Sequence, residues 1–180
     1  MDLKRITKEI TPLYSFLLWC VKMHYKNKVR RRYRWMHKQM HMIDPCSEKR
    51  QKYWIKCGAH IDGQINIGAE VYFDAGNAEH IFIGEGTWIT SRCLLLCHKR
   101  DLAAYYMGSD VNKMPYIIDD IHIGKGVHVG MDTVIMPGVN IGDGAIIGAG
   151  ALITKDIPAY SLAVGRPAKV IKQFDSNYNE

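Results

Sequence analysis

The chain has 180 residues, 47% of them hydrophobic, and a formal net charge of +6. It is large enough for one packed domain with an N-terminal appendage. Its five cysteines form no CxxC pair and leave an odd one over. A regularly spaced zinc site is therefore excluded, and a reduced, cytoplasmic setting is the simplest expectation.

Residues 1–54 form a basic N-terminal segment that we expect to be helical. Positive charges gather between Lys22 and Lys38 among aromatic side chains, and no proline interrupts the chain between Leu13 and Asp44. The apolar run that begins at Leu13 is too short to span a membrane, and no small-residue cleavage site follows it. We therefore expect the segment to belong to the mature protein.

The basic segment has three interpretations. It can pack its aromatic side chains on the rest of the protein or on a neighbouring subunit and leave its charges in water. A basic helix with aromatics also suits the anionic surface of a membrane, which would place the protein peripherally at the inner face. Nucleic-acid binding is the least favoured interpretation, because no recognised nucleic-acid motif accompanies the charge.

The clearest pattern is a period of six residues in the second half of the chain. Branched aliphatic residues occupy the repeated position without a gap: Ile123, Val129, Ile135, Ile141, Ile147 and Ile153. Glycine directly follows four of them: Gly124, Gly130, Gly142 and Gly148. A period of six fits neither a helix nor an alternating strand, so the chain must turn after every short extended run. The pattern predicts an all-β core, a parallel β-helix of triangular section with aliphatic residues inside and glycines at the corners.

The same repeat occurs earlier in the chain, with two interruptions. About four extra residues near Gly76 to His80 separate one register from the next, and the pattern then disappears over residues 97–120. A loop of that length in a compact domain is usually functional or disordered, and the well-formed repeats on both sides favour a functional loop. We therefore predict a β-helix over residues 55–165 with an active-site loop at 97–120, followed by a C-terminal tail, 166–180.

Two stretches resemble a known family. The run IHIGKGVHVGMDTVIMPGVNIGDGAIIGAGALITKDIPAYSLAVGRPAKVIKQF, from Ile121 to Phe174, is similar to the C-terminal half of the hexapeptide-repeat O-acetyltransferases, which include maltose, galactoside and exopolysaccharide acetyltransferases. The stretch WITSRCLLLCHKRD, from Trp88 to Asp101, resembles the part where colanic-acid type enzymes place their catalytic histidine. The resemblance implies a left-handed β-helix that transfers an acetyl group from acetyl-CoA to a hydroxyl, commonly of a sugar or polysaccharide precursor. It also implies a homotrimer with active sites between subunits.

The resemblance places the general base at His98. An alcohol attacks a thioester only if its proton is removed as the bond forms, and an imidazole with a reference pKa near 6.5 suits that role. Asp101 is a candidate for orienting the ring, and Ser91 for donating to the oxyanion or contacting the substrate. His128 stands where several family members carry a tryptophan that contacts the acceptor, so the acceptor here is expected to differ.

The coenzyme is expected along the last coils. Its thin pantetheine arm needs close backbone approach and its phosphates need cations. The residues that the resemblance nominates are Gly130, Gly148, Ala149, Thr154, Lys155, Arg166 and Lys169. The alternative function is a noncatalytic β-helix assembly or membrane-scaffold protein whose working surface is the basic segment.

A metal site is not expected. His98, His122 and His128 invite comparison with β-helical zinc enzymes that use three histidines. In a coil of three hexapeptides, however, residues six apart lie on adjacent faces, and only residues about eighteen apart stack. His122 and His128 are therefore predicted not to converge within one subunit.

Overall fold

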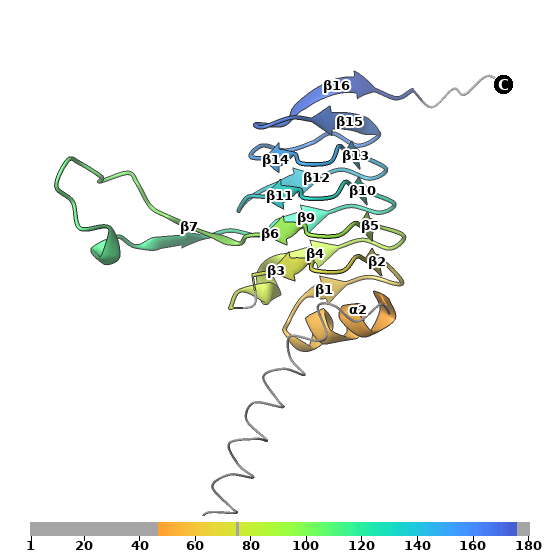
Figure 1. Cartoon of the computed structure of the whole chain (residues 1–180), viewed down its shortest axis with the longest axis horizontal. Helices are drawn as coiled ribbons and strands as arrows, with labels where there is room; N and C mark the ends of the chain where they lie inside the picture. The colour runs from red at the N-terminus through yellow and green to blue at the C-terminus, as the bar shows by residue number, and fades with distance from the viewer. Residues whose placement is uncertain (1–46, 75, 176–180) are drawn as a thin grey trace, which may run out of the picture. The chain divides into compact units, whose positions relative to one another are not determined.

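The computed structural model describes residues 47–74 and 76–175, all of which belong to one compact unit, 41–180. Three parallel sheets form its sides, and successive short strands pass from one sheet to the next (Figure 1). The first sheet contains β1 (His60–Ile61), β4 (Ile81–Ile83), β9 (Ile121–Ile123) and β12 (Asn140–Ile141). The second contains β2 (Asn66–Ile67), β5 (Trp88–Ile89), β10 (His128–Val129), β13 (Ile146–Ile147), β15 (Ser161–Val164) and β16 (Lys169–Gln173). The third contains β3 (Tyr72–Phe73), β6 (Leu94–Leu95), β11 (Val134–Ile135) and β14 (Leu152–Ile153).

The strand register shows how the sequence repeat becomes a coil. Val129 pairs with Ile147, eighteen residues further on, so three hexapeptides make one turn. Ile61 pairs with Ile83, four residues beyond one turn, and the short 3-10 helix η1 (Ala78–His80) lies in this insertion. The predicted all-β core of parallel strands is confirmed, whereas the left-handed sense of the coil stays a prediction.

The repeated aliphatic residues fill the interior of the coil. Ile135, Ile147 and Ile153 are at most 1% exposed, and the smaller residues four places after each repeated position are buried beside them. One of these smaller residues, Thr133, donates its hydroxyl hydrogen bond to the carbonyl of Gly130 at 2.7 Å, so its polar group is satisfied. Burial of this column removes apolar surface from water in every turn, which is the main stabilisation available to strands of two residues.

The corner glycines are required by the neighbouring turn of the coil. A Cβ atom on Gly130 would lie 2.5 Å from the backbone nitrogen of Ala149, and one on Gly142 would lie 2.4 Å from that of Ala159. Neither glycine has a positive φ; the left-handed backbone occurs two residues later, for example at Asp132 and Gly144. The glycine therefore permits close stacking, and a separate residue makes the turn.

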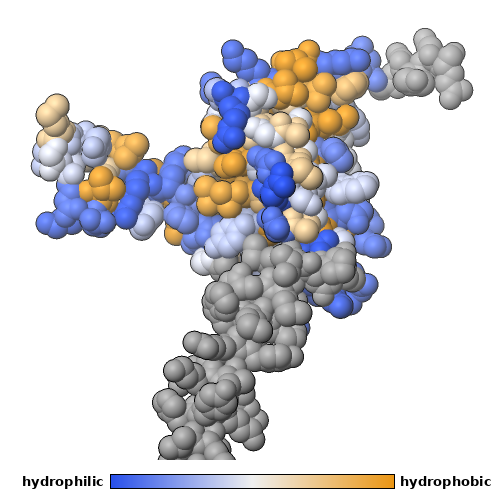
Figure 2. Space-filling model, viewed as in Figure 1, coloured by the Kyte–Doolittle hydropathy of each residue, from blue (hydrophilic) through white to orange (hydrophobic). Residues whose placement is uncertain are grey.

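Different elements cover the two ends of the coil. Helix α2 (Ser47–Lys56) packs on the first turn, where Trp54 stacks on Phe73 at 4.7 Å and the Nε atom of Arg50 donates to the Ile67 carbonyl at 2.7 Å. At the other end, β16 runs antiparallel to β15. Figure 2 shows hydrophobic side chains gathered near these last strands.

Only the end of the predicted helical segment falls in the described part of the chain, within α2. The basic cluster between Lys22 and Lys38 lies outside it, so its helices and its surface contacts stay predictions. Among the described residues, no helix has the length and apolar character needed to cross a membrane.

The chain leaves the coil after β6 and returns before β9, and residues 97–120 are called the arm from here on. Strands β7 (His98–Arg100) and β8 (Tyr116–Ile118) pair antiparallel, and a 3-10 turn, η2 (Val111–Lys113), lies between them. The arm projects from the side of the coil (Figure 1). At its base, the backbone N–H of Asp119 donates to the Cys97 carbonyl at 2.9 Å.

Candidate active site

His98 lies where the arm leaves the coil, and its imidazole is held from the coil side. The Nδ1 atom of His98 hydrogen-bonds to Oδ2 of Asp74, which follows β3. Because an ionised carboxylate only accepts, Nδ1 carries the proton and Nε2 carries the lone pair. The His98 side chain is 38% exposed and that of Asp74 only 7%. This arrangement fixes the ring through Nδ1 and leaves the side chain partly exposed.

Several donors converge on the Asp74 carboxylate. Besides His98, the side-chain nitrogen of Asn77 donates to Oδ2 at 3.1 Å, and the backbone N–H of Cys97 donates to it at 3.3 Å. Burial by itself would raise the pKa of Asp74, but the hydrogen bonds from His98, Asn77 and Cys97 and the charge interaction with His98 outweigh it. The pKa of Asp74 is therefore held below its ordinary value, and the carboxylate stays ionised near neutral pH.

The arm holds the same imidazole from its other side. The ring of Tyr116 on β8 meets the His98 ring edge-on, with 5.4 Å between the centroids and 78° between the planes. The guanidinium carbon of Arg100 lies 4.0 Å from the centroid of the Tyr116 ring, and its Nη1 donates to the Met114 carbonyl at 2.6 Å. Residues of both the coil and the arm therefore fix the position of His98.

Cys97, beside His98, is unsuited to act as a nucleophile. Its side chain is fully buried. Burial first, and then the negative charges of Asp74, Asp120 and Glu79, raise the pKa of its thiol to about 12. The reactive thiolate is consequently absent near neutral pH.

Most of the predicted site residues fall at two corners of the coil and on the arm. Asp101 lies on the arm, where Oδ1 accepts a hydrogen bond from the Ala103 backbone N–H at 2.9 Å, whereas the carboxylate against His98 is that of Asp74. Residues at the corner between the second and third sheets are Ser91, Gly130, Gly148 and Ala149. Thr154 and Lys155 follow β14, at the corner where the chain leaves the third sheet. They are in register with the residues that follow β6 and lead into the arm.

The remaining nominated residues lie elsewhere on the coil. Arg166 lies in the turn that follows β15, and Lys169 is the first residue of β16. This turn contacts β14, because the backbone N–H of Leu152 donates a hydrogen bond to the Gly165 carbonyl at 3.0 Å. His128 lies on the outer face of the second sheet, with its ring centroid 5.8 Å from that of Trp88. Within one chain, His128 and His98 are therefore on different sides.

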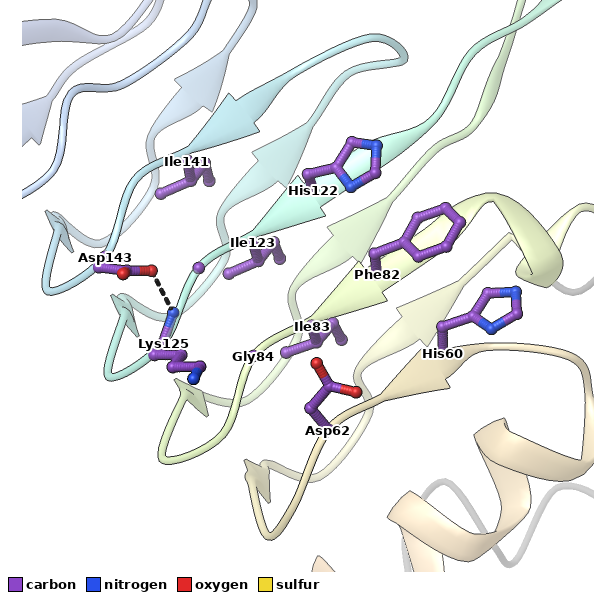
Figure 3. Close-up of a pocket in the computed structure, with 11 residues that line it drawn as sticks. His60, Asp62, Phe82, Ile83, Gly84, His122, Ile123, Lys125, Ile141 and Asp143 are labelled. Atoms are coloured by element: carbon purple, nitrogen blue, oxygen red, sulfur yellow. Dashed lines mark hydrogen bonds between the residues drawn. The ribbon is translucent and has the colours of Figure 1, made fainter.

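A groove of about 420 Å³ crosses the outer face of the first sheet (Figure 3). The rings of His60, Phe82 and His122 form a row on three adjacent strands, with 4.6 Å between successive centroids. Asp120 accepts from Nδ1 of His80 at 2.6 Å and lies 3.8 Å from Nε2 of His122. In the part of the chain that the structure describes, no three His, Cys, Asp or Glu side chains are arranged to hold a metal ion.

Sequence reasoning missed Asp74, Asn77 and Tyr116. The register gives a signal for the first, because Phe73 pairs with Leu95 and Asp74 therefore lies beside the residues that lead to His98. Tyr116 carries no such signal, since residues 97–120 show no periodicity from which a hairpin pairing could be predicted.

Comparisons with known proteins agree with the fold. Residues 120–155 match the family described as bacterial transferase hexapeptide (six repeats). A 57-residue segment is 51% identical to the acetyltransferase SACOL2570 of Staphylococcus aureus (strain COL), covering 32% of this chain and 29% of that protein. A 59-residue segment is 49% identical to a chloramphenicol acetyltransferase of Agrobacterium fabrum, covering 32% and 28%. The aligned segments thus span less than a third of these curated relatives.

Solved structures share the architecture over most of the chain. The maltose O-acetyltransferase from Clostridium difficile 630 superposes with a TM-score of 0.60 at 23% identity, covering 82% of this chain and 88% of that one. The hexapeptide-repeat acetyltransferase VCA0836 from Vibrio cholerae O1 biovar eltor, solved with acetyl-CoA, gives a TM-score of 0.57 at 16% identity, covering 78% and 85%. This chain therefore has the fold of the hexapeptide-repeat acetyltransferases, and residues 120–155 carry their repeat.

The lowered pKa of Asp74 predicts an acid-sensitive contribution to stability. Because the folded pKa lies below the unfolded reference of about 3.9, the contribution is complete above that value and is lost as pH falls through the folded pKa. We expect the difference in unfolding free energy between the wild type and Asp74→Asn, measured by urea titration, to shrink between pH 5 and pH 2.5. Asp101→Asn is the matched control, and a difference for Asp74→Asn that stays constant over this range would contradict the prediction.

Proposed function

We propose that this protein is an acetyl-CoA-dependent O-acetyltransferase that acts on a hydroxyl of a sugar or polysaccharide precursor. The observation that carries the proposal is the His98 imidazole, which is held through Nδ1 by the buried Asp74 carboxylate while its side chain is 38% exposed. Support for the donor and reaction comes from proteins of the same fold, which include a maltose O-acetyltransferase and an acetyltransferase solved with acetyl-CoA.

In this proposal the acetyl group passes directly from sulfur to oxygen. Nε2 of His98 removes the proton of the acceptor hydroxyl as its oxygen attacks the thioester carbonyl. The carbon–sulfur bond then breaks, and the protonated imidazole returns the proton to the departing CoA thiolate. Asp74 fixes the tautomer and stabilises the imidazolium that forms in between. The buried, protonated Cys97 is consistent with transfer that uses no acyl-enzyme.

In this proposal, some of the predicted residues act at the site of a neighbouring subunit. Ser91 and His128 lie on other sides of the chain than His98, so we propose that they reach the oxyanion or the acceptor from an adjacent copy. In this proposal the coenzyme lies beside the third sheet, which has Gly130, Gly148 and Ala149 at one end and Thr154 with Lys155 at the other. Arg166 and Lys169, above β14, supply cations for the phosphates.

The base is tested by substituting His98. General-base catalysis contributes about a hundredfold to ten-thousandfold, so we expect His98→Ala to lower kcat by about that factor with little change in acetyl-CoA binding. Asp74→Asn should also lower kcat, because the amide can hold the wrong tautomer. Thiol release from acetyl-CoA with a panel of sugars measures both effects.

The matched comparison for Asp74→Asn is Asp101→Asn, since the sequence nominated Asp101 for the same role. A larger loss of kcat in Asp101→Asn would restore that assignment. If His98→Ala keeps more than about a third of wild-type turnover while chemistry limits the rate, the base is another group. Absence of thiol release with every acceptor, together with absence of acetyl-CoA binding, would favour the noncatalytic assembly.

The coenzyme site is tested at Lys155 and Arg166. If these side chains meet the CoA phosphates, alanine at either position should raise the KM for acetyl-CoA and leave the acceptor KM nearly unchanged. Lys125→Ala, on the opposite side of the coil, is a control with the same loss of charge. An unchanged KM for acetyl-CoA in both test variants would place the phosphates elsewhere.

We also propose that the protein forms a homotrimer with its active sites between subunits. The outer face of the third sheet carries apolar side chains on adjacent strands, including Tyr72, Leu94, Val134 and Leu152, which suits contact with another copy. Light scattering should return about three times the 20.5 kDa chain mass. An active monomer at micromolar concentration would contradict the shared site.

A further inference from the structure

Arg100 shares one face of the β7–β8 hairpin with His98. In an antiparallel pair, alternate residues of a strand point to the same side, and directly paired residues share a face. His98 pairs with Ile118 and Arg100 pairs with Tyr116, so these four side chains lie on one face of the hairpin. Lys99, paired with Ile117, lies on the opposite face. A cation therefore stands beside the proposed base, two residues along the same strand.

Two contacts fix the guanidinium of Arg100 in place. It lies on the Tyr116 ring, and one of its nitrogens donates to the Met114 carbonyl at 2.6 Å. The other cations of the arm behave differently, since Lys99 lies 3.8 Å from Asp119 and Lys113 lies 3.8 Å from Asp110. Across the described residues, no carboxylate oxygen lies within 4.0 Å of an Arg100 nitrogen.

Such an arginine is prepared to bind an anion. A guanidinium has five N–H donors in a rigid fork, and among the described residues a protein acceptor engages only one of the Arg100 nitrogens. Its position is already set by the ring and the carbonyl, so little side-chain freedom is lost when a ligand binds. The surrounding surface is open, because Tyr116 is 54% exposed and Ile118 is 47% exposed.

We propose that Arg100 binds an anionic group of the acceptor, so that the acceptor is an acidic saccharide bearing a carboxylate or a phosphate. Tyr116 links the two functions, since its edge meets the His98 imidazole and its face supports the Arg100 guanidinium. The anion held by Arg100 brings the neighbouring hydroxyl of the same saccharide to Nε2 of His98. This inference rests on the proposed O-acetyltransferase activity and names its substrate class.

The test compares acceptors that differ at carbon 6: methyl glucoside has a hydroxyl there, methyl glucuronide a carboxylate and methyl glucoside 6-phosphate a phosphate ester. A charge-assisted hydrogen bond is strong enough to favour an anionic acceptor by about tenfold to hundredfold in kcat/KM. We expect at least one anionic glycoside to show this preference in the wild type, and the preference to fall as salt is added. A preference for the glucuronide identifies a carboxylate, and one for the phosphate ester identifies a phosphate.

Arg100→Gln should abolish the preference by raising the KM of the anionic acceptor, and Arg100→Lys should restore part of it. Lys99→Gln removes the same charge one residue away on the other face of the hairpin, so it should keep the full preference. If turnover of these small glycosides is undetectable, ligand-observed NMR measures their binding to the same variants. Equal binding or turnover of neutral and anionic glycosides in the wild type, or a preference that survives in Arg100→Gln, would overturn the inference.

These outcomes are distinct from failure of the proposed function. Acetyl transfer to glycosides without a charge preference would contradict only the role of Arg100. Loss of acetyl-CoA binding and of thiol release with every acceptor would contradict the O-acetyltransferase proposal itself.

Discussion

Hydrogen bonding between successive turns of the coil is the constraint on which the rest of the structure depends. Strands pair at a spacing of about 4.8 Å, so each turn must bring the same backbone atoms against the turn before it. The N–H of Gly142 meets the Ile157 carbonyl at 2.9 Å, and the N–H of Gly148 meets that of Ala163 at 2.9 Å. No room remains for a Cβ atom at such corners, and only a column of similar aliphatic side chains fills the interior evenly.

The same constraint decides where the chain can carry an insertion. A segment that leaves the coil must return in register, because a displaced strand would leave its backbone groups unpaired. The arm meets this condition, since its two ends are joined by the hydrogen bond from Asp119 to Cys97 and the following strand β9 pairs with β4. The coil therefore tolerates a long arm at one corner while the core on either side remains continuous.

The periodic part of the structure could be predicted from the sequence, and the aperiodic part could not. The six-residue spacing predicted the buried column, the three-hexapeptide turn and the four-residue insertion near His80, because each follows from counting residues. The position of Asp74 against His98 depends on how that insertion is accommodated, and the Tyr116 contact depends on a hairpin pairing. Counting through the insertion places Asp74 directly after the Phe73–Leu95 pair, but it does not show that the His98 ring turns toward that carboxylate, and the hairpin has no repeat from which to count. The nearer Asp101 was nominated instead. Glycine was predicted at the corners to let the chain turn. In the structure it is required there because the next turn of the coil packs too closely for a Cβ atom.

The two partners of the His98 ring come from parts of the protein with different constraints. Asp74 belongs to the coil, where every substitution must respect close packing between turns. Tyr116 and Arg100 belong to the arm, whose residues pair mainly with one another and are largely open to solvent. The hydrogen bond that orients the imidazole therefore comes from the rigid part, whereas its aromatic neighbour comes from the more exposed part.

The elements at the two ends of the coil affect whether further copies can add to its strand edges. A parallel β-helix presents unpaired strand edges at its first and last turns, and such edges would template the addition of further copies without limit. Helix α2 lies over one end, where Nε of Arg50 donates a hydrogen bond to the Ile67 carbonyl. At the other end, β16 runs antiparallel to β15. Within the described residues, these two elements therefore oppose end-to-end addition of further copies at the strand edges that they occupy.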